Sequence, residues 1–217
     1  MDVVTASARD AEPEINAAVE PDRRVIVLSG VVSAATVTPI IDELQNAKPA
    51  ERLLIWIRAN GGGEIAQLIL LIQALGRTQA DVELAIGRYA MSAAATLWLW
   101  FFLDPIPGDD GVGRVVSVNP LKPAVLLLHR PRWPLGDGQY YCFVDDFDDE
   151  TVRNNLKAQL VIFDDMFERI IDVQGAGQVH AATIKHDGAT YKHHLQFARE
   201  AYYSNFDYII SLNGVSA

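Results

Sequence analysis

Three features of the sequence could together carry out acyl transfer. Ser92 lies between the short apolar strand predicted at Leu84–Ile86 and an Ala-rich stretch in which a helix is predicted to begin. A hydroxyl at a helix start lies beside free backbone N–H groups and the positive end of the helix dipole, which stabilise nearby negative charge. His129 ends another apolar stretch and could accept the serine proton, and Gly61–Gly63 could offer N–H groups to an oxyanion. These residue types therefore indicate a nucleophile, a base and an oxyanion pocket.

Each of these residues also has a plainer interpretation. A serine at a helix start is a common capping residue, and a histidine that ends an apolar strand is often a hydrogen-bonded core residue. The Gly61–Gly63 turn lacks the Lys-Ser/Thr pair of a P-loop and the spacing of a dinucleotide fingerprint. Cys142 is a weaker candidate nucleophile than Ser92, because the acidic stretch after it disfavours the thiolate. Residues 145–149 are acidic but lack an ordered ligand spacing, so we expect neither a metal nor a cofactor.

The elements predicted around these residues alternate along the chain. Continuous apolar runs predict buried strands, and apolar residues at helical spacing predict helices between them. The strands are expected at 24–28, 53–57, 82–86, 115–118, 124–129 and 208–212, and the helices at 33–46, 64–75, from Ser92 on, 150–173 and 195–203. This alternation is typical of a mostly parallel sheet with right-handed crossovers, so an α/β fold is predicted. Because ligands bind beyond the carboxyl ends of parallel strands, the glycine turn and Ser92 are expected to face one site.

The ends of the chain and the long helix predict its organisation. Residues 1–22 lack apolar periodicity and are expected to form a mobile arm, which leaves 23–217 as a single domain. The segment Glu150–Val173 predicts one long helix, which Gly175–Gly177 is expected to end. A helix of this length in a small domain is expected to project and to pack its apolar stripe against another copy. That stripe comprises Leu160, Ile162, Phe163, Met166, Phe167, Ile170 and Ile171.

The composition excludes some classes of partner. The 217 residues carry a formal net charge of −10, which is unlike the basic surface of proteins that bind nucleic acid or anionic lipid. A lone cysteine cannot form an internal disulfide, which fits a reducing cytoplasm. The apolar run Tyr89–Leu103 is shorter than the roughly 20 residues that a spanning helix needs, so no membrane attachment is expected. We therefore predict a cytoplasmic location.

The order of these motifs resembles that of one known family. The stretch IIDELQNAKPAERLLIWIRANGGGEIAQLILLIQAL is similar to the helix, strand, glycine turn and helix of the Clp protease proteolytic subunits (ClpP), within the ClpP/crotonase superfamily. AMSAAAT resembles the nucleophile motif of that family, VLLLHRP resembles its histidine motif, and AREAYYSNFDYII resembles its closing segment. The resemblance covers about residues 24–212. It implies a ClpP/crotonase-like fold of repeated ββα and βαβ units, with a projecting handle region at about 131–175.

The resemblance also implies roles for individual residues. Ser92 stands at the position of the catalytic serine and His129 at that of the catalytic histidine, while Gly62 and Ala93 stand where two amides form the oxyanion hole. The position of the triad aspartate is occupied by His193, and the nearest upstream carboxylate is Asp187. A Ser–His dyad, a triad completed by Asp187 and an impaired enzyme are therefore the alternatives. Asn60 and Gly63 replace a proline and a serine or valine of the family pattern.

These roles predict a serine-type peptidase that cleaves unfolded polypeptide inside a self-compartmentalised oligomer. The resemblance implies a ring-forming homo-oligomer, with stacked heptameric rings as in the family, and a Clp-type ATPase as a partner. Two other functions remain open at this stage. One is a non-catalytic ClpP-like subunit, which the missing aspartate favours. The other is a crotonase-like acyl-CoA enzyme, which would use the Gly62 and Ala93 amides to hold a thioester enolate.

Overall fold

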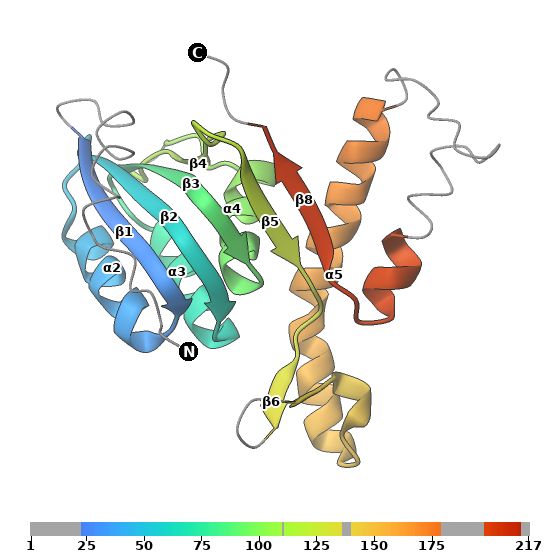
Figure 1. Ribbon diagram of the computed structural model, residues 1–217. Helices are drawn as coiled ribbons and strands as arrows, with labels where there is room; N and C mark the ends of the chain where they lie inside the picture. Colours follow the sequence, from blue (N-terminus) through green and yellow to red (C-terminus); the bar gives the residue numbers. More distant parts are fainter. Residues whose placement is uncertain (1–22, 110, 136–139, 179–197, 214–217) are drawn as a thin grey trace, which may run out of the picture.

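A six-stranded, mostly parallel sheet forms the centre of the protein (Figure 1). The structure is a computed structural model that describes residues 23–109, 111–135, 140–178 and 198–213. The strands follow the order β1-β2-β3-β5-β8, with β4 also paired to β3, and only β8 runs antiparallel to its neighbour. Their bounds are β1 Arg23–Val32, β2 Arg52–Gly63, β3 Asp81–Met91, β4 Val115–Ser117, β5 Ala124–Leu128 and β8 Tyr208–Leu212. The predicted α/β class with a parallel sheet is therefore confirmed.

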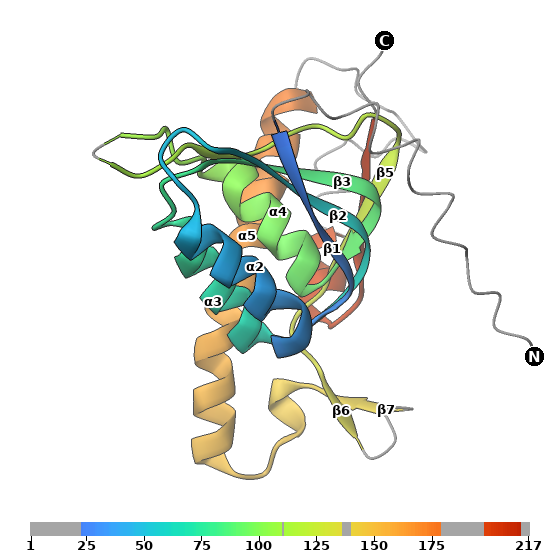
Figure 2. The ribbon, with the colours of Figure 1, turned by 90° about the vertical axis from the view of Figure 1, so that its left-hand side faces the viewer.

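The helices cover one face of this sheet. Seen from the side, they lie together on one side of the strands (Figure 2). They are α2 Ala34–Asn46, α3 Ile65–Leu75, α4 Ala93–Leu103 and α5 Glu150–Gln178. Each crossover returns the chain to the start of the next parallel strand, so the ends of β2, β3 and β5 reach the same edge of the sheet.

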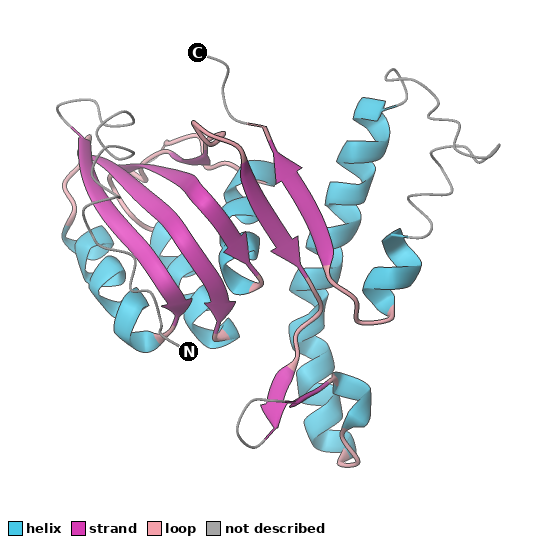
Figure 3. Ribbon diagram, viewed as in Figure 1, coloured by secondary structure: helices cyan, strands magenta, loops and turns pink. Residues whose placement is uncertain are grey.

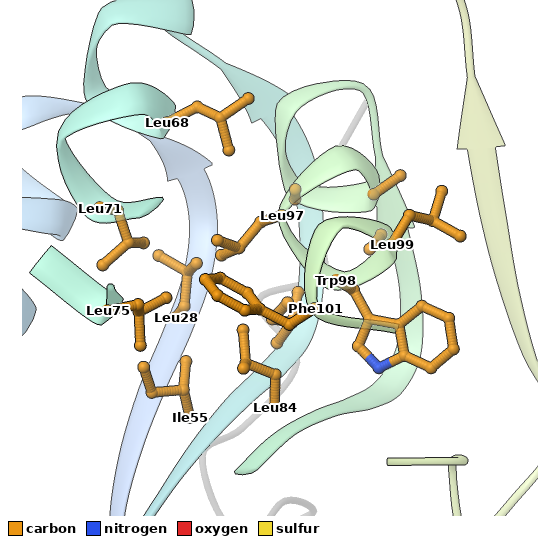
Figure 4. Close-up of a cluster of buried hydrophobic side chains, with 14 of the residues drawn as sticks. Leu28, Ile55, Leu68, Leu71, Leu75, Leu84, Leu97, Trp98, Leu99 and Phe101 are labelled. Atoms are coloured by element: carbon orange, nitrogen blue, oxygen red, sulfur yellow. The ribbon is translucent and has the colours of Figure 1, made fainter. Parts of the chain in front are cut away.

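The core lies between the sheet and α4. Three alanines begin this helix and are fully buried, which allows its first turn to approach the strands closely. Farther along α4, Phe101 points toward Leu28 and Leu84 of the sheet and Leu75 of α3 (Figure 4). Fully burying each of these large side chains contributes roughly 1.5–3 kcal/mol relative to leaving it exposed. This packing fixes the start of α4, and with it Ser92, against the ends of the strands.

The region after β5 differs in part from its prediction. The chain predicted as irregular forms a two-stranded antiparallel ribbon of β6 Trp133–Leu135 and β7 Tyr140–Cys142, followed by the short helix η2 Val144–Asp146. This ribbon and the first half of α5 extend away from the sheet (Figure 3). The helix was predicted to end at Gly175–Gly177, but α5 continues through Gly175 and Gly177 to Gln178, so that prediction is wrong. Glycine weakens a helix interior by about 1 kcal/mol but does not prevent it from forming.

The apolar stripe of α5 is buried within its own chain. Phe163, Met166 and Ile170 belong to the main core, and Phe167 and Ile171 pack with Tyr202 in a smaller cluster. The expectation that this stripe is an exposed patch in the monomer is therefore wrong. The physical reason is that α4, Tyr208 of β8 and the helix over residues 198–203 cover it. A homo-oligomer remains a prediction, but these residues do not supply its interface.

Two further expectations concern the N-terminal arm and membrane-spanning helices. The mobile arm at residues 1–22 lies outside the described residues. In the described ranges, none of the helices combines the length and the hydropathy that a membrane-spanning helix requires.

Candidate functional site

Ser92 occupies a sharp turn between β3 and α4. Its backbone has φ of 51° and ψ of −123°, a conformation that L-residues other than glycine rarely adopt and that costs on the order of 1–3 kcal/mol. Its N–H donates to Leu127 O at 2.8 Å, and its carbonyl accepts the N–H of Thr96 at 2.9 Å. The backbone of the serine is thus held by β5 on one side and by α4 on the other.

The Ser92 hydroxyl is not a helix cap. Ser92 stands at the N-cap position of α4, but its side chain makes no capping hydrogen bond. A residue selected only for this backbone shape would be glycine, since glycine adopts a positive φ without steric cost. The serine thus stands on a strained strand-to-helix turn, which is the kind of turn that presents a nucleophilic serine in other folds. The interpretation of Ser92 as a simple capping residue does not fit this geometry.

Gly62 lies directly against Ser92. It has φ of +86°, and a Cβ added at this position would lie 2.5 Å from Ser92 Cβ and 2.7 Å from Met91 O. Such distances are far below van der Waals contact, so only glycine fits here. The structure therefore brings together the glycine turn at the end of β2 and the serine at the end of β3, as the predicted topology requires. Ala93, the other predicted oxyanion donor, is the first residue of α4 and has no intrahelical partner for its N–H.

The Gly62 amide is engaged by the side chain of Asn60. Its N–H donates to Asn60 Oδ1 at 2.9 Å, which closes a local turn across the two residues. Asn60 is fully buried, and its Nδ2 has no hydrogen-bond partner within the described residues. An unpaired buried donor costs about 1–3 kcal/mol, so this group stands out in an otherwise satisfied core. The use of the Gly62 amide by an oxyanion remains a prediction.

His129 follows the last residue of β5 and is buried, with 8% of its surface exposed. Its Nδ1 lies 2.7 Å from the main-chain carbonyl oxygen of Arg130. Because a carbonyl oxygen only accepts hydrogen bonds, Nδ1 carries the proton, and Nε2 keeps the lone pair of a general base. Among the described residues, no hydrogen bond joins the Ser92 hydroxyl to this imidazole. Both nevertheless lie at the same edge, since Ser92 pairs with Leu127, two residues before His129.

Burial lowers the pKa of His129. Desolvation is the largest cause, and the positive charge of Arg132 acts in the same direction. The hydrogen bond to Arg130 and the negative charge of Asp207 oppose it and raise the pKa. The net direction is below the ordinary value of 6.5, so the imidazole is mostly neutral at pH 7.

Among the described residues, no carboxylate is hydrogen-bonded to His129, and Asp207, whose charge acts on the imidazole, is paired with Arg132 at 3.4 Å. Asp187 and His193 lie outside the described residues, so the sequence-based choice between a dyad and a triad with Asp187 stays a prediction. The carbonyl of Arg130 occupies the position next to Nδ1 that a carboxylate takes in a triad. Sequence reasoning missed this partner, because a main-chain carbonyl has no residue signature. It also missed the role of Asn60, although an asparagine before glycines is a known turn signal.

The acidic segment after Cys142 has structural partners. Asp146 accepts the N–H of Phe143, and Asp149 Oδ1 accepts the N–H groups of Thr151 and Val152 at the start of α5. Within the described ranges, no three side chains of histidine, cysteine, aspartate or glutamate gather as metal ligands would. No protein-family model matches this chain, and no curated protein has significant sequence similarity to it.

Proposed function

We propose that this protein is a serine-type peptidase of the ClpP type, with Ser92 as nucleophile and His129 as general base. The observation that carries the proposal is the strained turn at Ser92, whose hydroxyl makes no capping bond and whose Cβ lies against Gly62. The positive φ and the contact with a positive-φ glycine are geometric features independent of the family resemblance. They support a nucleophile that is partly accessible to solvent and lies beside backbone N–H donors.

The acylation step would use each of these groups. Nε2 of His129 accepts the proton of the Ser92 hydroxyl while Oγ bonds to the carbonyl carbon of the scissile peptide. The carbonyl oxygen becomes an oxyanion, which the Ala93 and Gly62 amides would stabilise. For this, the Gly62 N–H must leave Asn60 Oδ1, which holds it at 2.9 Å. The imidazolium then gives its proton to the leaving amine, the C–N bond breaks, and an ester on Ser92 remains.

Deacylation repeats the sequence with water. Nε2 takes a proton from the attacking water, a second oxyanion forms, and the proton returns to Ser92 Oγ as the ester bond breaks. The Arg130 carbonyl would hold His129 in the correct tautomer throughout. It is neutral, however, and so stabilises the imidazolium less than a carboxylate does. We therefore propose a working site of lower activity than a complete triad.

The pH dependence of the reaction follows from the burial of His129. Because desolvation lowers the pKa of this imidazole, the neutral base persists to lower pH than in an exposed histidine. The acid limb of kcat/KM against pH is expected to have its midpoint below 6.5. Asp207→Asn removes a negative charge that raises this pKa, so the midpoint should fall further. A midpoint above 6.5, or one that rises in Asp207→Asn, would contradict this assignment of the base.

A non-catalytic ClpP-like subunit is the second candidate, and one observation favours it. The Gly62 amide is occupied by Asn60, so one of the two expected oxyanion donors is engaged in the structure. A fluorophosphonate probe separates the two functions, because its tetrahedral adduct places an oxygen where the oxyanion forms. An active peptidase is labelled at Ser92, whereas a non-catalytic subunit is not. Nothing in the described residues favours the crotonase-like alternative.

The proposed substrate is unfolded polypeptide, cleaved inside a homo-oligomeric ring in the cytoplasm with a Clp-type ATPase as partner. Light scattering at micromolar concentration is expected to show an assembly several times the 23.9 kDa mass of one chain. A monomer under these conditions would exclude the compartment. Phe163→Glu is not a clean test of assembly, because Phe163 lies in the core of a single chain and its substitution would unfold the protein.

A further inference from the structure

The helix α5 contacts the chain directly after His129 through one ion pair. Arg130 Nε and one terminal nitrogen donate to the two carboxylate oxygens of Asp164, at 3.1 and 2.9 Å. This two-bond geometry fixes the plane of the guanidinium as well as its position. Arg130 is the residue whose main-chain carbonyl accepts the His129 Nδ1 proton. Arg130 therefore connects α5 to the imidazole, because its side chain binds Asp164 and its main-chain carbonyl contacts His129.

The ring of Tyr203 lies against the guanidinium of this ion pair, and the neighbouring Tyr202 packs on α5. The Arg130 guanidinium carbon lies 5.3 Å from the centre of the Tyr203 ring, within the range of a cation–π contact. Tyr202 stacks on Phe167 of α5, with ring centres 3.8 Å apart. The side chains of Arg130 and Asp164 are only 16% and 24% exposed, so solvent screens this pair less than a surface pair. Together, the ion pair and the ring of Tyr203 hold the Arg130 side chain in one position.

From these contacts we infer that Asp164 is a positioning residue, which acts through Arg130 to keep the main-chain carbonyl of Arg130 on His129 Nδ1. The inference deepens the proposed function, on which it rests, and gives α5 a direct part in it. Without Asp164, the Arg130 side chain loses its ion-pair partner, and the Arg130 backbone can shift within the range that Pro131 after it allows. The carbonyl then leaves Nδ1, and the proton is no longer held on that nitrogen. A histidine protonated on Nε2 cannot accept the Ser92 proton.

A second ion pair on α5 provides a matched control. Arg169 forms a two-bond pair with Asp104 at the end of α4, at 2.6 and 2.8 Å. Asp104→Asn therefore weakens the attachment of the same helix by the same chemistry, but at a residue with no contact to His129. General loosening of α5 would also appear in Asp104→Asn, although less strongly, because the side chains of Arg169 and Asp104 are 35% and 55% exposed. A specific effect on the imidazole would appear only in Asp164→Asn.

The test measures the tautomer of His129 in the full chain by imidazole ¹⁵N NMR. The protein carries ¹⁵N-labelled histidine, and the His129 signals are assigned by their loss in His129→Gln. Wild type and Asp104→Asn are expected to show neutral His129 protonated on Nδ1. In Asp164→Asn, the ratio of the two tautomers should shift by about tenfold toward the Nε2–H form, and the fluorophosphonate labelling rate should fall by at least about as much. Asp164→Glu, which keeps the carboxylate, should recover part of both.

The outcomes separate the inference from the proposed function. An unchanged tautomer in Asp164→Asn, or an equal shift in Asp104→Asn, would overturn the positioning role even if the wild type is labelled by the probe. Absence of labelling in the wild type would overturn the peptidase instead, while the tautomer measurement would still test the Arg130 contact. If Asp164→Asn does not fold, Arg130→Lys replaces it as the variant that loses the two-bond pair, and Asp164→Glu remains the variant that keeps the carboxylate. The Arg130→Lys variant keeps the positive charge but loses the two-bond geometry, so it should show the shift.

Discussion

Replacing Ser92 with alanine is expected to abolish fluorophosphonate labelling and to lower peptide turnover by at least about 10⁴-fold. The reason is that no other described group stands on the strained turn beside Gly62, so the covalent adduct has no alternative oxygen. Mass spectrometry of the labelled protein should place the adduct on Ser92, and peptide cleavage measures the turnover. The fold should persist, because the Ser92 side chain makes no capping hydrogen bond to α4 that alanine would lose.

His129→Ala tests whether the two residues act as one unit. It is expected to reduce labelling nearly as far as Ser92→Ala, because a serine hydroxyl at neutral pH is a poor nucleophile without a base. The double variant should then be no worse than either single one. Ser33→Ala is the control, since Ser33 precedes α2 as Ser92 precedes α4. Equal labelling of Ser92→Ala and wild type would contradict the assignment of Ser92 as the nucleophile.

The second large effect is expected for Gly62→Ala. A Cβ at this position would lie 2.5 Å from Ser92 Cβ and 2.7 Å from Met91 O, and the backbone φ is +86°. Relief of these contacts must move Ser92 or the end of β2, so labelling and turnover are expected to fall by at least about 10²-fold, the size of the loss of one oxyanion donor. The rate of probe labelling at saturating concentration measures this directly.

Gly61→Ala is the matched control for that substitution. A Cβ at Gly61 meets no atom within 4 Å, and Gly61 does not have a positive φ. This variant adds the same methyl group one residue away and should keep the labelling rate of the wild type within a few-fold. Comparable losses in both variants would mean that the turn as a whole is sensitive, and the specific contact between Gly62 and Ser92 would lose its support. Thermal unfolding of both variants separates lost activity from lost fold.

Much of the fold could be predicted because burial leaves a strong mark on the sequence. Residues 53–57 are apolar and buried throughout, which is typical of a strand in a parallel sheet. Residues 24–28 also predict a strand, but only Leu28 is buried there, because β1 lies at the edge of the sheet. The β6–β7 ribbon was missed because Pro134, inside β6, indicates a break in a central strand. Pro134 is tolerated because both strands of a two-stranded ribbon are edge strands, which can contain proline. The end of α5 was missed because glycine signals a helix end only where tertiary contacts do not extend the helix.

The site was predictable only as far as its residue types and topology allow. Ser92 and Gly62 could be placed together, since both follow neighbouring parallel strands. The orientation of His129 could not, because its partner is the main chain of Arg130. The contact between Arg130 and Asp164 joins distant parts of the chain, and neither residue differs from an ordinary surface charge in sequence. Only the packing of α5 on the rest of the domain, mainly on α4, brings them within hydrogen-bond distance.

The pairing of β5 bears on when the proposed site is completed during synthesis of the chain. β5 pairs with β3 over three residues, Val125 to Leu127, but with β8 over all five of its own. The ribosome completes β8 only after the whole of α5, so the strand that leads to His129 gains its second neighbour late. Chains fold from the N-terminal side as they emerge, and the turn at Ser92 can therefore form before the base is fixed. For the proposed peptidase, this order keeps a nascent chain inert until its last strand joins the sheet.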